Sequence, residues 1–381
     1  MARRPAEPTE PAEAAAPASP PSSPSRARAA APERASETEP VPPLSSPPDE
    51  DEPVSAPPAS APAARKGPPP APEAADPDAA VEAPRAPTIP SDATDRAERE
   101  PPSLREKRIG VIGAGAMGRA LCEGLVLAGA APANRILVSD AKAGRVQSLH
   151  ASLGIRVAES NSQVAKYTDV ILLAVPGPEV LPLLAEVAEA LRREAGKPLP
   201  LIISLASGVP LSALESHLSE PLAVVRAVAN LPLQVAAGAS AYARGTNADA
   251  PQMALAARIF TSLGIAVEVP ESLLDTVLAL SGAGPAYAFL ILEAMIDGGV
   301  QAGLPRETAR QLAAQTLLGS ARMVLETGQH PAQLRDLVAE PASPAATALA
   351  ALERDGLRPA LIDAIALATA HSRELERPDK A

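Results

Sequence analysis

Three glycines near the start of the apolar part of the chain have the spacing of a phosphate-binding loop. Gly113, Gly115 and Gly118 form the pattern Gly-x-Gly-x-x-Gly. In such a loop the first glycine makes a tight turn, the second lets a pyrophosphate approach the backbone, and the third lets a helix pack on a strand. The spacing predicts a dinucleotide site, and a purely structural turn is the alternative. The candidate cofactor residues are Gly113, Ala114, Gly115, Ala116, Met117 and Gly118.

The residues on either side of this loop supply the strand and the helix that it requires. A short β-type run, residues 108–112, comes directly before it. The apolar positions that follow recur every three or four residues, at Met117, Leu121, Leu125 and Ala128. This spacing predicts a helix with one face against a sheet, ended by Gly129. The N–H groups and the dipole at the start of that helix attract an anion.

An acidic residue stands where the ribose of a bound dinucleotide is expected. Asp140 follows a predicted strand, residues 135–139, about 20 positions after the loop. A carboxylate there binds the ribose hydroxyls of NAD and repels the 2′-phosphate of NADP. Because Ser139, Lys142 and Arg145 can still hold that phosphate, NAD and NADP both remain open. Asp140 has the alternative role of a turn or helix-capping residue.

Strand-like and helix-like segments alternate as far as residues 267–270. A run of continuous apolar residues is typical of a parallel strand that is covered on both faces. Strands alternating with helices of this length predict a doubly wound α/β domain with a mostly parallel sheet. Further strands are expected at 155–158, 169–175, 199–205 and 224–228, and helices at 179–191 and 211–218.

From residue 271 to Leu375 only helical periodicity is found. Residues 285–300 are apolar nearly all round, and a helix without a polar face must be buried from every side. A small helical domain has little interior of its own, so a second copy of the chain is the expected cover. The sequence therefore predicts an all-α dimerisation domain and a homodimer or higher oligomer.

The N-terminal part of the chain differs in composition from the rest. More than half of the 45 prolines precede Ser103, among Ala, Ser and Glu. Such a segment has too little apolar area to offset the entropy of ordering. We expect a disordered tail over residues 1–104, acting as a spacer or as an interaction arm. A Rossmann domain over 105–269 and a helical dimerisation and substrate domain over 270–377 are expected to follow.

Composition and charge restrict the kinds of ligand and partner that the protein is expected to bind. The net charge of −11 argues against nucleic acid, which requires clustered Lys and Arg. The one cysteine, Cys122, is expected to be a buried and inert thiol, and the four histidines are not spaced as ligand pairs, so no metal is expected. No apolar segment follows the opening MARRPAEP. We therefore expect neither a signal peptide nor a membrane span, and a cytoplasmic protein.

The helical half carries the most specific motifs. In order and spacing they resemble those of pyrroline-5-carboxylate reductases, and the resemblance runs from about Arg108 to Leu375. The segments are 280–287 (LSGAGPAY), 293–300 (EAMIDGGV), 303–305 (GLP), 314–319 (AQTLLG) and 330–336 (HPAQLRD).

This resemblance implies a two-domain reductase that transfers hydride from NADPH or NADH to the C=N bond of 1-pyrroline-5-carboxylate, giving L-proline. The cofactor supplies the hydride, and the protein aligns the two reactants and neutralises the substrate carboxylate. Besides the glycine loop, the resemblance assigns cofactor contacts to Ser139, Asn161, Ala174, Val175 and Pro176.

The substrate side departs from the family pattern. The resemblance implies a pocket between an Arg-x-Met-Pro-Asn-Thr-Pro segment, of which Asn230 and Pro232 survive among the last five residues, and a Ser-Pro-Gly-Gly-Thr-Thr loop. An alignment without gaps gives Glu340 in place of a hydroxyl and Ala345 in place of the threonine that reaches the imine, and Pro344 removes an N–H donor. The candidate substrate residues are Asn230, Glu340, Pro341, Ala342, Ser343, Pro344 and Ala345.

Two functions follow from these patterns. The first is an NAD(P)H-dependent reductase of proline biosynthesis, with activity weakened or altered by the rewritten loop. The second is a non-catalytic paralogue that binds the dinucleotide and has an interaction or regulatory role. A β-hydroxyacid dehydrogenase is excluded because it requires a catalytic lysine in the second domain, and after Glu268 the only lysine is Lys380, at the end of the chain.

Overall fold

The structure is a computed structural model that describes residues 103–192, 198–218 and 221–376. The tail expected over residues 1–104 lies outside the described residues except for its last two. Of these, Leu104 is 3% exposed and packs in the core of the first domain. The packed part of the chain therefore includes Leu104.

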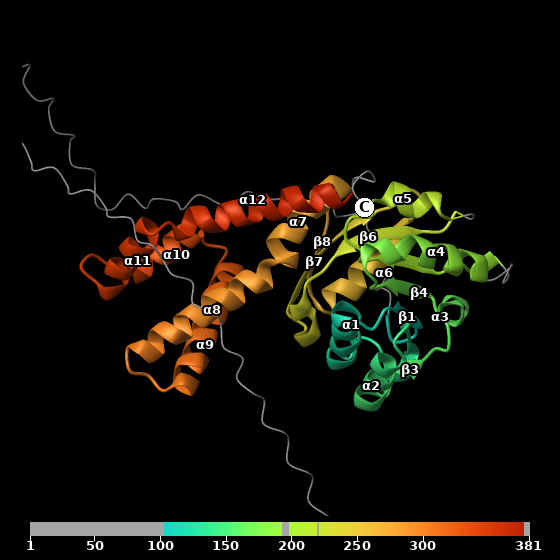
Figure 1. Ribbon diagram of the computed structural model, residues 1–381, viewed down its shortest axis with the longest axis horizontal. Helices are drawn as coiled ribbons and strands as arrows, with labels where there is room; N and C mark the ends of the chain where they lie inside the picture. The colour runs from blue at the N-terminus through green and yellow to red at the C-terminus, as the bar shows by residue number, and fades with distance from the viewer. Residues whose placement is uncertain (1–102, 193–197, 219–220, 377–381) are drawn as a thin grey trace, which may run out of the picture. The chain divides into compact units, whose positions relative to one another are not determined.

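One mixed sheet organises the first domain (Figure 1), and its strand order is β3-β2-β1-β4-β5-β6-β7-β8. The pairs from β3 to β6 are parallel, β6 and β7 are antiparallel, and β7 and β8 are parallel again. At the centre, Ile109 pairs with Ile136 on one side and with Val170 on the other. The strands are β1 (Ile109–Ile112), β2 (Ile136–Ser139), β3 (Arg156–Val157), β4 (Val170–Leu173), β5 (Leu201–Ser204), β6 (Val224–Val228), β7 (Gly238–Arg244) and β8 (Gly264–Glu268).

Helices cover both faces of this sheet and form two separate apolar cores. The buried residues of α1, α2 and α6 join one core, and those of α3, α4 and α5 join the other. Cys122 lies in the first core, so its predicted burial is confirmed, and burial raises the pKa of its thiol to about 12. The doubly wound fold is confirmed as well. The helices are α1 (Ala116–Leu127), α2 (Ala143–Leu153), α3 (Asn161–Tyr167), α4 (Gly177–Arg192), α5 (Leu211–Ser216) and α6 (Ala250–Thr261).

The predicted elements agree with the structure to within two residues at each end. The helices α2 and α3 were given no predicted bounds, and two further elements were not predicted. The first is the antiparallel strand β7, in which Gly238 and small residues such as Ala239 and Ser240 replace a continuous apolar run. The second is α6, whose N-terminus carries a capping box between Asp249 and Gln252. The helix α6 connects β7 to β8, and these two strands extend one edge of the sheet.

The second domain is all helical, as expected, but it has almost no core of its own. No residue of α8 or α11 is buried, and α9 buries only Ala309 and Ala313. Phe289 and Leu290 on α8 are 62% and 68% exposed. Its elements are α7 (Leu274–Val277), a π-helical turn (Leu278–Gly282), α8 (Gly284–Gln301), α9 (Arg306–Thr327), α10 (Pro331–Val338), α11 (Pro344–Arg354) and α12 (Leu357–Leu375).

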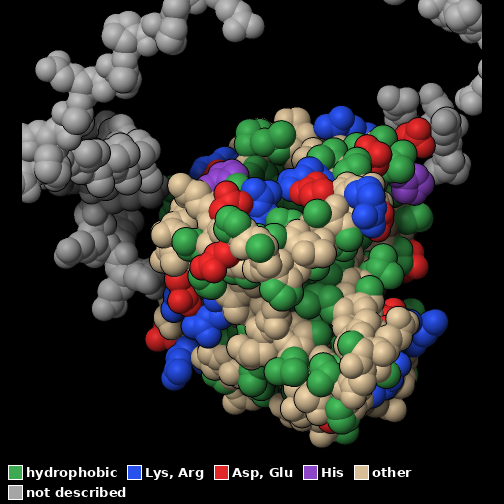
Figure 2. All heavy atoms as spheres, turned by 90° about the vertical axis from the view of Figure 1, so that its left-hand side faces the viewer, with side chains coloured by type: hydrophobic (Ala, Val, Ile, Leu, Met, Phe, Trp, Pro, Cys, Tyr) green, Lys and Arg blue, Asp and Glu red, His purple; other side chains and the backbone are tan. Residues whose placement is uncertain are grey.

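This lack of cover leaves an apolar surface on the helical half. Figure 2, which views that end of the molecule, shows hydrophobic side chains open at the surface between charged ones. Among the described residues, the helical run Glu271–Gln301 alone is long and apolar enough to cross a membrane by length and composition. A helix that packs against a second copy has the same composition. The absence of a membrane span stays a prediction.

Candidate cofactor and substrate site

Two of the three loop glycines are required by the fold itself. Gly113 has φ +100, and a Cβ there would lie 2.5 Å from the Ala174 carbonyl oxygen. A Cβ on Gly118 would lie 1.8 Å from the Gly113 carbonyl oxygen. Both contacts are impossible for a side chain, so these glycines let β1, β4 and α1 converge.

The middle glycine has a different role. A Cβ on Gly115 would meet only the Arg145 guanidinium, at 4.0 Å, so the protein leaves this space open. Gly115 is the N-cap residue of α1, and no side chain caps that helix. The N–H groups of the first turn are therefore available to an anion, and the open space suits a pyrophosphate. The residues present fit a nicotinamide dinucleotide.

The other predicted cofactor residues gather at the same edge of the sheet. The Ser139 hydroxyl donates to Asn161 Oδ1 at 2.8 Å, and Asn161 Nδ2 donates to Glu186 at 2.9 Å. Val175 borders the loop, because its side chain would lie 3.0 Å from a Cβ on Gly113. Ala174 and Pro176 stand on either side of Val175, between β4 and α4. The structure thus brings these residues together at the C-terminal ends of the strands.

Asp140 makes the contacts of a turn residue. Its carboxylate accepts hydrogen bonds from the N–H groups of Ala114 and Lys142, both at 2.7 Å, and lies 3.5 Å from Arg145. Burial alone raises the pKa of Asp140, but these donors and the Arg145 charge outweigh it, so the pKa is lowered. Asp140 therefore stays ionised and fixes the glycine loop.

A cavity of about 240 Å³ lies beside the loop, between the sheet and the helical half. Met117 of α1 is on its wall, and so are the ends of β5 and β6, α7 and the π-helical turn. Ligands of doubly wound proteins bind at the carboxyl ends of the strands, and this cavity is at that edge. Its polar side chains are Ser207, Arg226 and Asp275.

Two of these side chains are buried and were not predicted. Arg226 is 4% exposed and forms ion pairs with Glu271 at 3.0 Å and Glu376 at 2.6 Å. Asp275 is 6% exposed and accepts a hydrogen bond of 2.5 Å from the Ser372 hydroxyl. The sequence holds a signal for the first, since Arg226 is a charged residue within the apolar strand β6. No local pattern marks the second.

Asn230 joins the two domains rather than facing the cavity with a free amide. Its Nδ2 donates to the Ser281 carbonyl at 3.1 Å, and its Oδ1 accepts from the Ala239 N–H at 2.8 Å. The residue is 8% exposed. Asn230 therefore holds the segment after β6 against the π-helical turn that borders the cavity.

The predicted substrate loop does not border the cavity beside Met117. Residues 340–345 connect α10 to α11, at the end of α12 that is remote from the sheet (Figure 1). Ala342 has φ +64, a conformation that favours glycine, so the backbone keeps a glycine-like turn without a glycine. Ser343 caps α11 by accepting from the Ala346 N–H at 3.1 Å, and Pro344 is the first helical residue. Glu340, Pro341 and Ala345 complete the loop, and Glu340 is exposed.

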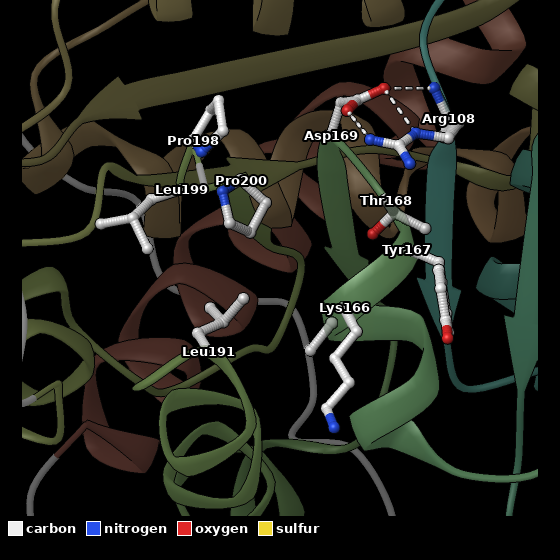
Figure 3. A pocket seen from close by; sticks show the side chains of 10 residues that line it. Arg108, Lys166, Tyr167, Thr168, Asp169, Leu191, Pro198, Leu199 and Pro200 are labelled. Carbon is white, nitrogen blue, oxygen red and sulfur yellow. Dashed lines mark hydrogen bonds and ion pairs between the residues drawn. The ribbon is translucent and has the colours of Figure 1, made fainter. Parts of the chain in front are cut away.

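A second cavity, of about 260 Å³, lies at the opposite edge of the sheet (Figure 3). Arg108 and Asp169 on its wall form an ion pair at 2.6 Å, and apolar side chains such as Leu191 and Leu199 line much of the rest. It is separated from the glycine loop by the length of the strands. The cavity beside Met117, which adjoins the glycine loop, is therefore the candidate functional site.

Comparisons with known proteins identify the relatives of this chain. Residues 271–375 match the family model described as "Pyrroline-5-carboxylate reductase dimerisation". Residues 108–208 match the family model described as "NADP oxidoreductase coenzyme F420-dependent". The pyrroline-5-carboxylate reductase of Methanosarcina acetivorans is 41% identical over 71% of this chain and 99% of its own length. Human pyrroline-5-carboxylate reductase 2 is 39% identical over 70% of this chain and 83% of its own length.

Solved structures give the same result. The pyrroline-5-carboxylate reductase of Coxiella burnetii is 36% identical, with a TM-score of 0.64 over 71% of this chain and 99% of its own. The pyrroline carboxylate reductase of Plasmodium falciparum, solved with NADP bound, is 28% identical, with a TM-score of 0.64 over 72% of this chain and 100% of its own. The match extends over the Rossmann and helical domains alike, and the chain belongs to the pyrroline-5-carboxylate reductase family.

Proposed function

We propose that this protein reduces 1-pyrroline-5-carboxylate to L-proline with NADPH or NADH. The observation that carries the proposal is the position of the cavity beside Met117. It adjoins a glycine loop built for a dinucleotide, in a chain whose relatives are named for this reaction. The relatives do not favour the non-catalytic alternative.

The protein's own residues bind and orient the two reactants. A bound NADPH or NADH supplies the hydride. The first turn of α1 holds the pyrophosphate, while Ser139, Asn161 and the segment 174–176 border the rest of the dinucleotide. Arg145, next to Gly115, is placed to meet a 2′-phosphate, and Asp140 is already engaged with the loop. We therefore propose NADP as the preferred cofactor.

A second copy of the chain completes the substrate site. Residues 340–345 lie at the far end of α12 from the glycine loop (Figure 1), so one chain does not bring them to its own cavity. The helical half also exposes the apolar face of α8, which a second copy would cover. We propose that α10 and α11 of one chain place this loop at the cavity of its partner.

The loop retains a means of binding a carboxylate despite its altered residues. Ala342 keeps the positive φ of the turn, and residue 345 presents an N–H group at the start of α11, whereas the Ala346 N–H already donates to the Ser343 hydroxyl. Pro344 lacks an N–H at the first helical position, where it has no intrahelical partner in any case. The negative charge of Glu340 opposes binding of the carboxylate. We therefore expect an active enzyme with a raised KM.

The test is to mix the purified protein with pyrroline-5-carboxylate and NADPH or NADH and to follow the cofactor absorbance. We expect turnover, with a higher kcat/KM for NADPH than for NADH. Replacing residues 342–345 by Gly-Gly-Thr-Thr should raise kcat/KM about ten- to a hundredfold. Each restored polar contact contributes on the order of 1 to 3 kcal/mol. Dinucleotide binding with no turnover in either protein would contradict the proposal.

A further inference from the structure

The cavity beside Met117 has an acidic group in its wall that forms no ion pair with a cation of the described residues. Asp275 is 6% exposed, and its Oδ1 accepts the 2.5 Å hydrogen bond from Ser372. Within the described ranges, no Lys, Arg or His forms an ion pair with this carboxylate. A buried charge is strongly unfavourable unless it is paired. A cation that arrives with the ligand would provide that pair.

The buried arginine of the same cavity does not serve this purpose. Arg226 is already held by two carboxylates, Glu271 at 3.0 Å and Glu376 at 2.6 Å. With all groups ionised, these three residues and Asp275 have a net charge of −2. The cavity wall therefore favours a positively charged group over a neutral one.

We propose that the Asp275 carboxylate is the counter-ion of the protonated ring nitrogen of the substrate. This inference rests on the proposed imine reduction. The hydride brings the electron pair of the new C–H bond, and the C=N π pair becomes a lone pair on nitrogen. The proton already on that nitrogen remains as the N–H of L-proline. The nearby negative charge raises the fraction of bound imine that is protonated, which is the form that accepts hydride readily.

Ser372 is a positioning residue in this arrangement. Ser372 lies near the end of α12 and is 3% exposed, and its hydroxyl donates the hydrogen bond that fixes Asp275 Oδ1. Ser372→Ala should lower kcat/KM for the imine less than Asp275→Asn does. Ser372→Thr keeps the hydroxyl and should restore most of the loss, whereas a role in packing alone would make threonine no better than alanine.

The decisive measurement separates charge from shape. L-proline carries a cationic ring nitrogen, and tetrahydrofuran-2-carboxylate has a neutral oxygen at that place. Both are titrated calorimetrically into the full-length protein saturated with NADP⁺. Asp275→Asn should weaken proline binding about tenfold or more and change binding of the oxygen compound less than about threefold. Ser207→Ala, on the same cavity wall, should affect the two ligands equally.

The pH profile gives an independent readout. In the wild type, Asp275 favours the bound imine cation. Ser372 donates to Asp275, Arg226 shares the cavity wall with it, and Glu271 and Glu376 pair with Arg226. Asp275→Asn should therefore move the alkaline limb of kcat, which reports the bound complex, to lower pH by about one unit. An unmoved limb together with equal effects on both ligands would overturn the proposal.

The remaining outcomes distinguish this inference from the proposed function. If Asp275→Asn weakens NADP⁺ relative to NADPH and leaves proline unaffected, the carboxylate serves the nicotinamide cation and the counter-ion proposal fails. If the wild type turns over the imine and Asp275→Asn is equally active, only the counter-ion proposal fails. If the wild type shows no turnover but binds proline through Asp275, the proposed reaction fails and the charge assignment stands. A wild type that binds neither ligand overturns both.

Discussion

At the scale of single residues, the three loop glycines have separate tasks. Gly118→Ala places a Cβ 1.8 Å from the Gly113 carbonyl oxygen, so the loop or α1 must move. We expect the free energy of unfolding to fall by about 1 to 3 kcal/mol. In Gly115→Ala the added Cβ meets open space, so the free energy of unfolding should change by less than about 0.5 kcal/mol. Its affinity for the dinucleotide should fall about tenfold or more.

Thermal unfolding and dinucleotide titration of the two variants check this division. The variants control for each other, because both add one methyl group to the same loop. A Gly115→Ala protein that keeps its full affinity would show that the pyrophosphate does not approach this residue. A Gly118→Ala protein of unchanged stability would contradict the packing described for the end of β1.

Ala342 offers a second test at this scale. Its φ of +64 is unfavourable for a residue with a Cβ, and glycine removes that cost. Ala342→Gly should raise the free energy of unfolding by about 0.5 to 1 kcal/mol, after allowing for the greater freedom of glycine in the unfolded chain. Ala339→Gly is the control, since Ala339 has φ −93 and glycine brings no relief. Denaturant titrations that rank the two the other way would contradict the strain.

The cofactor side of the site could be predicted from sequence because its signal is local. The loop glycines lie within six consecutive residues, and each spacing reflects a contact within one strand, turn and helix. Asp275 and Ser372 could not be predicted in this way, since they are 97 positions apart and meet only when α12 packs against α7. Arg226 has a local signal, since it is a charged residue within the apolar strand β6.

At the scale of elements, an ion pair joins the starts of β1 and β4. Asp169 accepts from the Arg108 backbone N–H at 2.8 Å and from its guanidinium at 2.6 Å (Figure 3). Burial raises the pKa of Asp169, but the Arg108 hydrogen bonds and charge outweigh it, so the pKa is lowered. A group with a lowered folded-state pKa stabilises above its unfolded value and loses that effect as the pH falls through the folded value.

Asp169→Asn should therefore lower the free energy of unfolding at pH 7 by about 0.5 to 1 kcal/mol, a modest amount because the pair is partly exposed. The difference from wild type should shrink as the pH falls below about 4. Denaturant unfolding between pH 2 and 7 measures it. Glu326→Gln breaks a more exposed pair within α9 and serves as the control. A difference that grows toward acid pH would contradict the lowered pKa.

The elements themselves could be predicted where one periodicity dominates. Continuous apolar runs marked β4 and β5, and the strand before the glycines marked β1. The antiparallel β7 was missed because Gly238, Ala239 and Ser240 give neither an apolar run nor an alternation, and its place is set by pairing with β6 and β8. Strand preference of this kind depends on neighbours rather than on the strand itself.

At the scale of the whole molecule, the helical half leaves an apolar face uncovered in the single chain. α8 has no buried residue although it is among the most apolar segments of the chain. An exposed patch of this kind marks an interface. The sequence itself predicts that this helix needs to be covered, because a helix without a polar face is unfavourable in water. It does not show that the substrate loop lies far from the glycine loop of the same chain.

Self-association should therefore depend on α8 and not on an equally exposed leucine elsewhere. Leu290 on α8 is 68% exposed in the single chain, and Leu127 at the end of α1 is 66% exposed. Leu290→Arg places a charge in the proposed interface, where it is desolvated without a partner, and should shift the protein toward monomer. Leu127→Arg adds the same charge at a surface that stays in water and should leave the assembly unchanged.

Analytical ultracentrifugation over a range of protein concentrations measures both variants, and dinucleotide titration of the same samples separates assembly from folding. Because the glycine loop lies within one chain, monomeric Leu290→Arg should still bind NADPH, whereas its imine turnover should be lost together with the partner's loop 340–345. Turnover that persists in a monomer would show that a chain can bring this loop to its own cavity. A fully assembled Leu290→Arg protein would instead place the interface on another face of the helical half.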